Sequence, residues 1–239
     1  MKLYGIRFAK GFKYGTRETV FRTEKGNREL IPDFPFFYYL AEYEGLHIMI
    51  DTGFRDERLA ADMGVALLPI ESEIRQVFGI FPKIDVIFLT HSHWDHTGNI
   101  DLYPEAGLIM SRLTYGQAMS EGSSPVKKRL QEAKTQISLV EERECFYDFF
   151  HFEVIGGHAP DSSVLCFQAD QDTYCITGDE CYLCDNMERN IAIGICSCKE
   201  KNERFIRKAY ERGWIPLPFH DAEILDKYDR LTENIVRIV

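Results

Sequence analysis

Three histidines and an aspartate lie close together in the segment His91-Ser92-His93-Trp94-Asp95-His96. The whole chain of 239 residues contains only seven histidines, so this clustering is not expected from chance. Imidazole and carboxylate groups are the ligands that borderline divalent cations such as zinc prefer. One ion needs only three or four protein ligands, and four candidates stand in this segment alone. Together with further candidates downstream, the segment predicts two ions.

The spacing of these residues has a physical reason. The apolar run from Ile84 to Leu89 comes just before them and predicts a buried strand. Because extended backbone directs alternate side chains to the same side, His91 and His93 can bind one ion. A helical turn after them would direct Asp95 and His96 toward a second ion. Two neighbouring metals can activate a water at neutral pH and stabilise both ends of a bond being cleaved, which predicts a hydrolytic centre.

Further polar groups follow other apolar runs that are typical of strands. They are Asp51 after Leu46–Ile50, His158 after Phe152–Ile155, Asp179 after Thr173–Thr177, and His220 after Ile215–Phe219. Polar side chains at the ends of several buried strands lie on loops that a rigid scaffold holds. The sequence therefore predicts one shared site at the ends of these strands.

This ordered set of residues resembles the signature of the metallo-β-lactamase superfamily. The matching pieces, in chain order, are Asp51-Thr52-Gly53, His91 to Gly98, Gly157-His158, Gly178-Asp179 and His220. The resemblance spans nearly the whole chain. It implies an α/β fold of four αββα layers, in which two mixed β-sheets are flanked by helices.

The resemblance also implies how two divalent ions would be held. The residues similar to ligands of the first metal are His91, His93 and His158. The residues similar to ligands of the second metal are Asp95, His96 and His220. Asp179 is similar to the carboxylate that bridges both ions, and Asp51 is expected to orient a ligand imidazole. Zinc is the expected metal, with iron, manganese or cobalt as alternatives, because His/Asp sites accept all of them.

One branch of the superfamily fits best. Tyr182, three residues after Asp179, is similar to a tyrosine of the N-acyl homoserine lactonase group that directs its phenol at the substrate carbonyl. The aromatic run Phe36–Leu40 and the pair His220-Asp221 are also similar to that group. The resemblance implies hydrolysis of a lactone or ester by a metal-bridging hydroxide, with Tyr182 and Asp95 as catalytic residues. Tyr182 could equally pack beneath the site.

Three other functions remain open. Other hydrolases of the superfamily, such as glyoxalase II-like thioesterases, β-lactamases and phosphodiesterases, share these ligands. A di-iron reductase of oxygen or nitric oxide fits less well, because such proteins usually have glutamate where His93 stands. The third is a non-catalytic metal-binding or redox-sensing protein. A further metal could be held by Cys181, Cys184, Cys196 and Cys198, although reduced thiols are the simpler interpretation.

Composition restricts the partners. The formal net charge of -10 would repel a phosphate backbone, which disfavours nucleic acid as a partner. No apolar stretch is long enough to span a bilayer, and the first residues are typical of a strand rather than a signal peptide. With many free thiols, these features predict a cytoplasmic protein that acts on a small molecule. No linker-like segment interrupts the chain, so we expect one domain over residues 1–239; the oligomeric state is not predicted.

The apolar patterns also predict the elements that position the site. Strands are expected near 3–8, 36–41, 46–50, 84–90, 106–110, 137–140, 152–156, 163–169, 173–177 and 214–219. Helices are expected near 72–79, 111–120, 125–134 and 202–212. The segment from Phe54 to Ile70 could cover an acyl chain through Met63, Val65, Leu67 and Leu68, or pack in the core. His47 lies within a strand and is expected to be a packed histidine.

Overall fold

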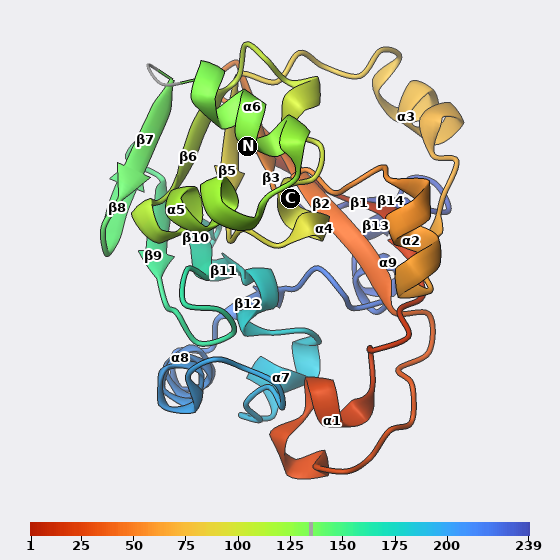
Figure 1. The fold of residues 1–239 in the computed structure, drawn as a ribbon, viewed down its shortest axis with the longest axis vertical. Helices are drawn as coiled ribbons and strands as arrows, with labels where there is room; N and C mark the ends of the chain where they lie inside the picture. Colours follow the sequence, from red (N-terminus) through yellow and green to blue (C-terminus); the bar gives the residue numbers. More distant parts are fainter. Residues whose placement is uncertain (134–135) are drawn as a thin grey trace.

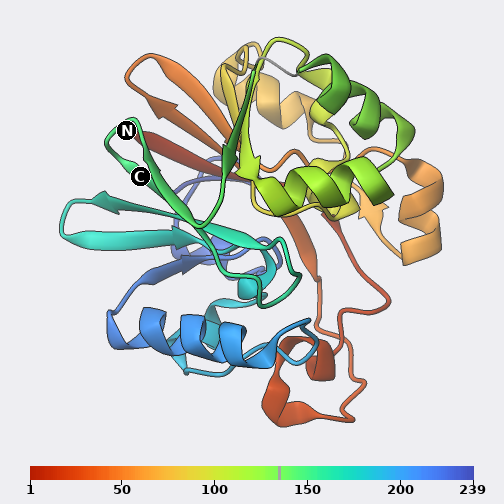
Figure 2. The same ribbon diagram turned by 60° about the vertical axis from the view of Figure 1, so that its left-hand side comes forward.

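A computed structural model describes residues 1–133 and 136–239 of the chain. Within it, two mixed β-sheets pack face to face, and helices cover their outer faces (Figures 1 and 2). Both termini lie near each other, and Figure 2 marks them at one end of the paired sheets. The αββα arrangement expected from the sequence is confirmed.

The larger sheet contains both antiparallel and parallel pairs. Its order is β13 (Asp229–Arg230), β14 (Ile235–Arg237), β1 (Lys2–Lys10), β2 (Pro35–Tyr43), β3 (Leu46–Ile50), β5 (Val86–Leu89), β6 (Gly107–Ser111) and β7 (Ile137–Val140), with β4 (Ala66–Leu67) paired to β1. The strands from β3 to β7 along this order are parallel, and those from β13 to β3 are antiparallel. Since parallel strands end at the same edge, the loops after β3 and β5 lie side by side.

The smaller sheet lies against the larger one. Its order is β12 (Ile215–Leu217), β11 (Asp172–Ile176), β10 (Ser163–Ala169), β9 (Phe150–Val154) and β8 (Arg143–Phe146). The interface between the two sheets is rich in aromatic rings: Phe88 of β5 packs against Phe150 and Phe152 of β9, and all three are buried. Burying a phenylalanine contributes roughly 1.5–3 kcal/mol, so this interface stabilises the scaffold that carries the loops.

Separate helices cover each sheet. Those against the larger sheet are α2 (Glu57–Met63), α3 (Glu71–Phe78), α5 (Arg112–Glu121) and α6 (Ser124–Glu132). Those against the smaller sheet are α7 (Cys184–Glu188) and α8 (Lys199–Glu211). Phe205, Ile206 and Ala209 form the buried face of α8, as the helical spacing predicts. No helix among the described residues is long and apolar enough to cross a membrane.

Short helical segments connect the larger elements. They are α1 (Arg17–Val20), η1 (Arg22–Glu24), α4 (Trp94–Thr97), η2 (Ile100–Leu102), η3 (Gly178–Glu180) and α9 (Ile224–Lys227). The turn α4 supplies the expected change from extended to helical backbone after His93, so Asp95 and His96 leave the strand direction. In chain order this turn follows β5 and precedes β6.

All expected strands and helices have a counterpart, mostly within two residues at each end. The helix at 202–212 begins earlier, at Lys199. The last residue of the helix expected over 125–134 lies outside the described residues. The sequence patterns did not predict α2, which Asp56 caps by accepting from the Leu59 N–H at 2.9 Å and Gly64 ends with a φ of 71°. An aspartate cap and a closing glycine are the signals that could have located it.

His47 differs from its expected environment. It is half-exposed on β3, and its Nδ1 lies 3.9 Å from Asp85. His47 is therefore not a ligand, as expected, but it is packed less closely than predicted, because residue 47 lies near the start of a strand whose later residues are the buried ones. This His–Asp pair belongs to neither of the groups described below.

Candidate metal centre and substrate pocket

The polar residues singled out in the sequence lie on loops and turns that follow strands. Asp51 follows β3 directly, and His91 and His93 follow β5. Asp179 lies in η3, after β11, and His220 follows β12. His158 follows β9, in the loop between β9 and β10. These loops converge, and the structure brings all seven candidate ligands into two adjoining groups.

The first group contains the imidazoles of His91, His93 and His158. His93 Nδ1 lies 3.0 Å from His91 Nε2 and 3.1 Å from His158 Nε2. Asp179 approaches the same point, with Oδ2 lying 3.3 Å from His158 Nε2 and 3.8 Å from His91 Nε2. Three ring nitrogens and one carboxylate oxygen therefore face a common position, which is a donor set suited to zinc.

The second group contains Asp95, His96 and His220. Asp95 Oδ2 lies 3.5 Å from His96 Nε2 and 3.8 Å from His220 Nε2. The other oxygen of Asp179, Oδ1, lies 3.2 Å from each of these two imidazole nitrogens. Asp179 thus presents one oxygen to each group, which is the arrangement a bridging carboxylate requires.

Two buried atoms at the junction of the groups lack hydrogen bonds. They are His96 Nε2 and Asp179 Oδ1, neither of which makes a hydrogen bond of acceptable geometry with another described residue. Buried polar atoms are nearly always satisfied by a protein group, a water or an ion. A divalent cation would satisfy both atoms at once, so the residues present fit the metal that the fold implies.

Burial and charge keep these groups in the protonation states that metal binding needs. Burial lowers the pKa of His91 well below its usual range and lowers the pKa of His158 to about 3, so both rings stay neutral with a free lone pair. Burial acts to raise the pKa of Asp179, but three neighbouring histidines hold this pKa well below its usual range. The carboxylate is therefore ionised.

His96 has the opposite shift. Burial acts to lower its pKa, but three neighbouring aspartates outweigh that effect and raise the pKa well above its usual range. This imidazole sits in a strongly negative environment that attracts positive charge. A proton or a metal cation can supply this positive charge, and a metal cation can supply it to several ligands at once.

Asp51 and Thr90 hold His96 in place. Asp51 Oδ2 lies 2.6 Å from His96 Nδ1, so the opposite ring nitrogen is directed at the centre. Thr90 donates to the same carboxylate through its N–H at 2.8 Å and its hydroxyl at 2.6 Å. The expected orienting contact of Asp51 is present, whereas the sequence gave no indication of the part that Thr90 plays.

Aromatic residues contact the imidazoles of His220 and His158. His220 Nδ1 lies 2.9 Å from the carbonyl of Pro35, and the ring of Phe34 stacks on it with 4.6 Å between centroids. The Tyr182 hydroxyl lies 3.1 Å from His158 Nδ1. Sequence patterns did not single out Phe34, because only the folded chain places it against His220.

Gly98, the last residue of the segment His91 to Gly98, has no room for a side chain. A Cβ at Gly98 would lie 2.5 Å from the Trp94 carbonyl oxygen and 2.7 Å from Phe54 Cβ. We expect Gly98→Ala to destabilise the protein by ~1–3 kcal/mol through overpacking, measured by urea unfolding. Gly116→Ala is the matched control, since nothing lies within 4 Å of its Cβ and alanine favours the helix by roughly 0.5–1 kcal/mol. Equal unfolding midpoints for the two variants would contradict this explanation of the motif.

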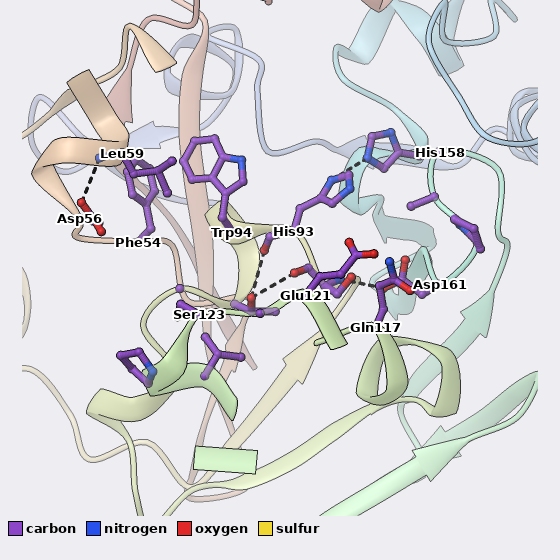
Figure 3. Close-up of a pocket in the computed structure, with 18 of the residues that line it drawn as sticks. Phe54, Asp56, Leu59, His93, Trp94, Gln117, Glu121, Ser123, His158 and Asp161 are labelled. Atoms are coloured by element: carbon purple, nitrogen blue, oxygen red, sulfur yellow. Dashed lines mark hydrogen bonds between the residues drawn. The ribbon is translucent and has the colours of Figure 1, made fainter. Parts of the chain in front are cut away.

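A cavity of about 860 Å³ opens beside the first group (Figure 3). His93 and His158 line it together with Phe54, Leu59 and Trp94. Figure 3 shows Phe54, Leu59 and Trp94 along one side of this pocket, with Gln117, Glu121 and Asp161 on another. A pocket of this size and largely apolar lining suits a small organic substrate.

The residues of the segment from Phe54 to Ile70 divide between the pocket and the core. Phe54 and Leu59 line the pocket, whereas Val65 is buried in the core between the larger sheet and its helices. Met63, Leu67 and Leu68 pack against that core and are not among the pocket residues. Of the two roles open to these four side chains, packing is the correct one.

The cysteines take no part in either group. Among residues 1–133 and 136–239, only the two His/Asp groups bring potential ligand atoms close enough together to hold an ion, and neither contains a cysteine. Cys181 and Cys184 are buried, and Cys196 lies in the wall of the pocket, where it accepts from Arg22 Nη2 at 3.1 Å. The structure thus gives no support to a cysteine metal site in the described part of the chain.

Comparison with solved structures shows the same fold in proteins of low sequence identity. A quorum-quenching N-acyl homoserine lactone lactonase is 20% identical with a TM-score of 0.76, and the match covers 95% of both chains. A mutant of AiiA from B. thuringiensis, with N-decanoyl-L-homoserine bound at the active site, is 20% identical with a TM-score of 0.74 over 95% of this chain and 96% of that one. AidC, a dizinc quorum-quenching lactonase, is 14% identical with a TM-score of 0.65 over 92% and 87%.

Sequence comparisons give a family but no individual relative. No curated protein matches the chain. The family model described as the metallo-beta-lactamase superfamily matches residues 32–196, a stretch that includes the central histidine motif, His158 and Asp179. This match covers more than half of the chain, and the chain therefore belongs to the metallo-beta-lactamase superfamily.

Proposed function

We propose that this protein is a dinuclear metal-dependent hydrolase of lactones or esters, with N-acyl homoserine lactones as its first candidate substrates. The observation that carries the proposal is the position of Asp179, whose two oxygens face two His/Asp groups beside a largely apolar pocket. Similar folds in lactonases, two of them with an N-acyl homoserine at the site, support the choice of substrate.

Seven side chains would hold the two cations. The first would be held by His91, His93 and His158, the second by Asp95, His96 and His220, and Asp179 would lie between them. Bound divalent cations supply a water that is nucleophilic at neutral pH and stabilise charge on the oxygens of the substrate. Asp51 keeps His96 oriented, and the buried carboxylates would offset the charge of bound ions.

In the proposed reaction, Tyr182 would donate a hydrogen bond to the substrate. Burial raises the pKa of its phenol well above the usual range, so the hydroxyl keeps its proton at neutral pH. When Nε2 of His158 binds a cation, the ring proton resides on Nδ1 and can be donated to the Tyr182 oxygen 3.1 Å away. The phenolic hydrogen is then free to stabilise negative charge on a carbonyl oxygen.

Asp95 and the pocket walls complete the proposed machinery. Asp95 is almost fully buried beside His96 and His220, where it would take up the proton that the attacking water releases and pass it to the leaving oxygen. Trp94 and Phe54 meet edge to face with 4.4 Å between ring centroids and offer an apolar surface for an acyl group. Such burial contributes about 25 cal/mol for each Å² removed from water.

A substrate panel tests the proposed reaction. Purified protein supplied with zinc, manganese, cobalt or iron is mixed with N-acyl homoserine lactones, simple esters, thioesters, a β-lactam and a phosphodiester. Ring opening is followed by acid release, and the other reactions by chromogenic products. We expect the lactones or esters to give the highest kcat/KM. Hydrolysis of only the thioester, β-lactam or phosphodiester would replace the proposal with another superfamily activity, and no turnover at all would contradict an enzymatic role.

Tyr182→Phe separates a catalytic role from a packing role for the phenol. If the hydroxyl stabilises the oxyanion, kcat falls by roughly 10²–10³ while metal content stays unchanged. The matched control is Tyr174→Phe, which removes a hydroxyl from a ring that stacks on Phe167 and lies outside both groups. Steady-state kinetics and elemental analysis give both readouts. Unchanged kcat in the Tyr182 variant would show that the ring merely packs beneath the site.

A further inference from the structure

Glu180 is a buried acidic residue that the proposed reaction does not use. It follows Asp179 directly in η3, and its side chain is fully buried. A carboxylate removed from water is costly unless several donors surround it. Glu180 lies outside the two candidate ligand groups, so its burial needs another explanation.

One oxygen of Glu180 gathers donors from the loop that carries His158. Oε1 accepts from the Gly157 N–H at 2.7 Å and from the His158 N–H at 3.0 Å. The hydroxyl of Ser162, at the other end of the same loop, donates to this oxygen as well. The carboxylate therefore binds the main chain of His158 to the short turn that contains Asp179.

The other oxygen is fixed by α8. Oε2 accepts from Asn202 Nδ2 at 2.8 Å, and the same nitrogen donates to the Glu180 carbonyl at 2.9 Å. Asn202 Oδ1 accepts from the Ile193 N–H at 3.0 Å, so its amide cannot turn over without losing these bonds. Asn202 is itself fully buried. This leaves a single orientation for both side chains.

The His158 loop packs directly on this pair. A Cβ at Gly157 would lie 2.3 Å from Glu180 Oε2 and 2.8 Å from Asn202 Cβ. Only glycine leaves the space in which the loop meets the carboxylate. Gly157 is thus explained by its contact with Glu180 and Asn202 rather than by the metal position itself.

We propose that Glu180, held by Asn202, is a positioning residue that fixes His158 relative to Asp179 and so sets the affinity of the first metal position. The inference rests on the metal centre of the proposed function but not on its substrate. His158 Nε2 and Asp179 Oδ2 lie 3.3 Å apart, and Glu180 contacts the backbone of one and adjoins the other in sequence.

Glu180→Gln tests this role without changing side-chain size. The new amide nitrogen would face Asn202 Nδ2, and two donors would then oppose each other. Metal-free protein is titrated with zinc against a chromophoric chelator and with cobalt by absorption spectroscopy. We expect affinity at the first position to fall roughly 10–100-fold and its cobalt spectrum to change, while the second position keeps its affinity. His158→Ala identifies which binding step belongs to the first position.

A second substitution should rescue the first. In the double variant Glu180→Gln with Asn202→Asp, the new carboxylate can accept from the new amide and still accept from the Ile193 N–H, but it no longer donates to the Glu180 carbonyl. We expect part of the lost zinc affinity and of the cobalt spectrum to return. A residue that only stabilised the fold would change the unfolding midpoint of the metal-free protein, but not the zinc affinity of the folded protein.

Asp221→Asn is the matched control. Asp221 is also buried and directly follows a candidate ligand, but it accepts from the Cys184 and Glu223 N–H groups and not from the His158 loop. We expect it to leave the first metal position unchanged. Circular dichroism checks that each variant is folded.

The outcomes separate this inference from the proposed function. Folded Glu180→Gln that binds both ions as tightly as the unsubstituted protein would overturn the positioning role, whatever the substrate. If that variant does not fold, Ser162→Ala removes one donor to Oε1, and unchanged affinity at the first position would overturn the role equally. Absence of any metal binding by the unsubstituted protein would refute both proposals. An unsubstituted protein that binds two ions but hydrolyses none of the substrates would refute only the proposed function.

Discussion

Replacing Asp179 by asparagine is expected to remove both metal binding and hydrolysis. Its two oxygens are the atoms shared by the two groups, with Oδ2 3.3 Å from His158 Nε2 and Oδ1 3.2 Å from His96 Nε2. An amide has the same shape but lacks the negative charge needed between two cations. Bound metals would lower the free energy of the transition state by several kcal/mol. Without them, kcat/KM should therefore fall at least about 10³-fold. Elemental analysis and steady-state kinetics of the same sample check both effects.

Asp85→Asn is the control for this variant. Asp85 also lies beside a histidine, with 3.9 Å between its Oδ2 and His47 Nδ1, but this pair belongs to neither group. We expect full metal content and unchanged kinetics in the control. An Asp179 variant that kept two ions and more than about a tenth of the activity, a loss under 1.4 kcal/mol, would contradict the bridging role.

Removing the metals is expected to lower the melting temperature of the unsubstituted protein markedly. The centre buries the carboxylates of Asp51, Asp95 and Asp179, and one oxygen of Asp179 makes no hydrogen bond with another described residue. A ligand present at 1,000 times its Kd stabilises the native state by about 4.1 kcal/mol. For a chain of this size each kcal/mol corresponds to roughly 2–4 °C, so Tm should fall by roughly 8–16 °C.

Differential scanning calorimetry after dialysis against a chelator measures this change, and adding back one divalent metal should reverse it. The Asp179→Asn variant supplies the control, because it should show a much smaller response to the chelator. Equal melting temperatures with and without metal would mean that the native state gains no stability from bound ions.

Local patterns predicted most of the scaffold because its signals are short in sequence. The aromatic and β-branched runs around Phe37 and Phe88 and the apolar stripe of α8 identify buried faces directly. The strand β8 (Arg143–Phe146) was not predicted, because its residues are mostly exposed and it is recognisable only by its pairing with β9. The short strands β13 and β14 likewise depend on the edge of β1.

The candidate site divides in the same way. His91, His93, Asp95 and His96 could be identified from their spacing alone, while His158, Asp179 and His220 needed a family pattern because each stands singly in the sequence. The structure brings all seven together, and their role as ligands stays a prediction. The hypothesis that Tyr182 acts in catalysis is likewise left to the substitution described above.

The groups that support the site were beyond sequence reasoning. Thr90 and Asn202 are ordinary polar residues until folding places them against Asp51 and Glu180. Phe34 contacts His220 across a long separation in sequence, and nothing local marks it. The pocket wall depends on how the loop after β3 meets α4, which the close approach of Phe54 to Gly98 determines. Such contacts follow from tertiary packing and not from periodicity.

Anomalous diffraction from crystals grown with zinc tests the dinuclear centre most directly. We expect two strong peaks per chain, one among His91, His93 and His158 and the other among Asp95, His96 and His220, with Asp179 contacting both. A single peak, peaks elsewhere, or no peak after zinc supplementation would contradict it.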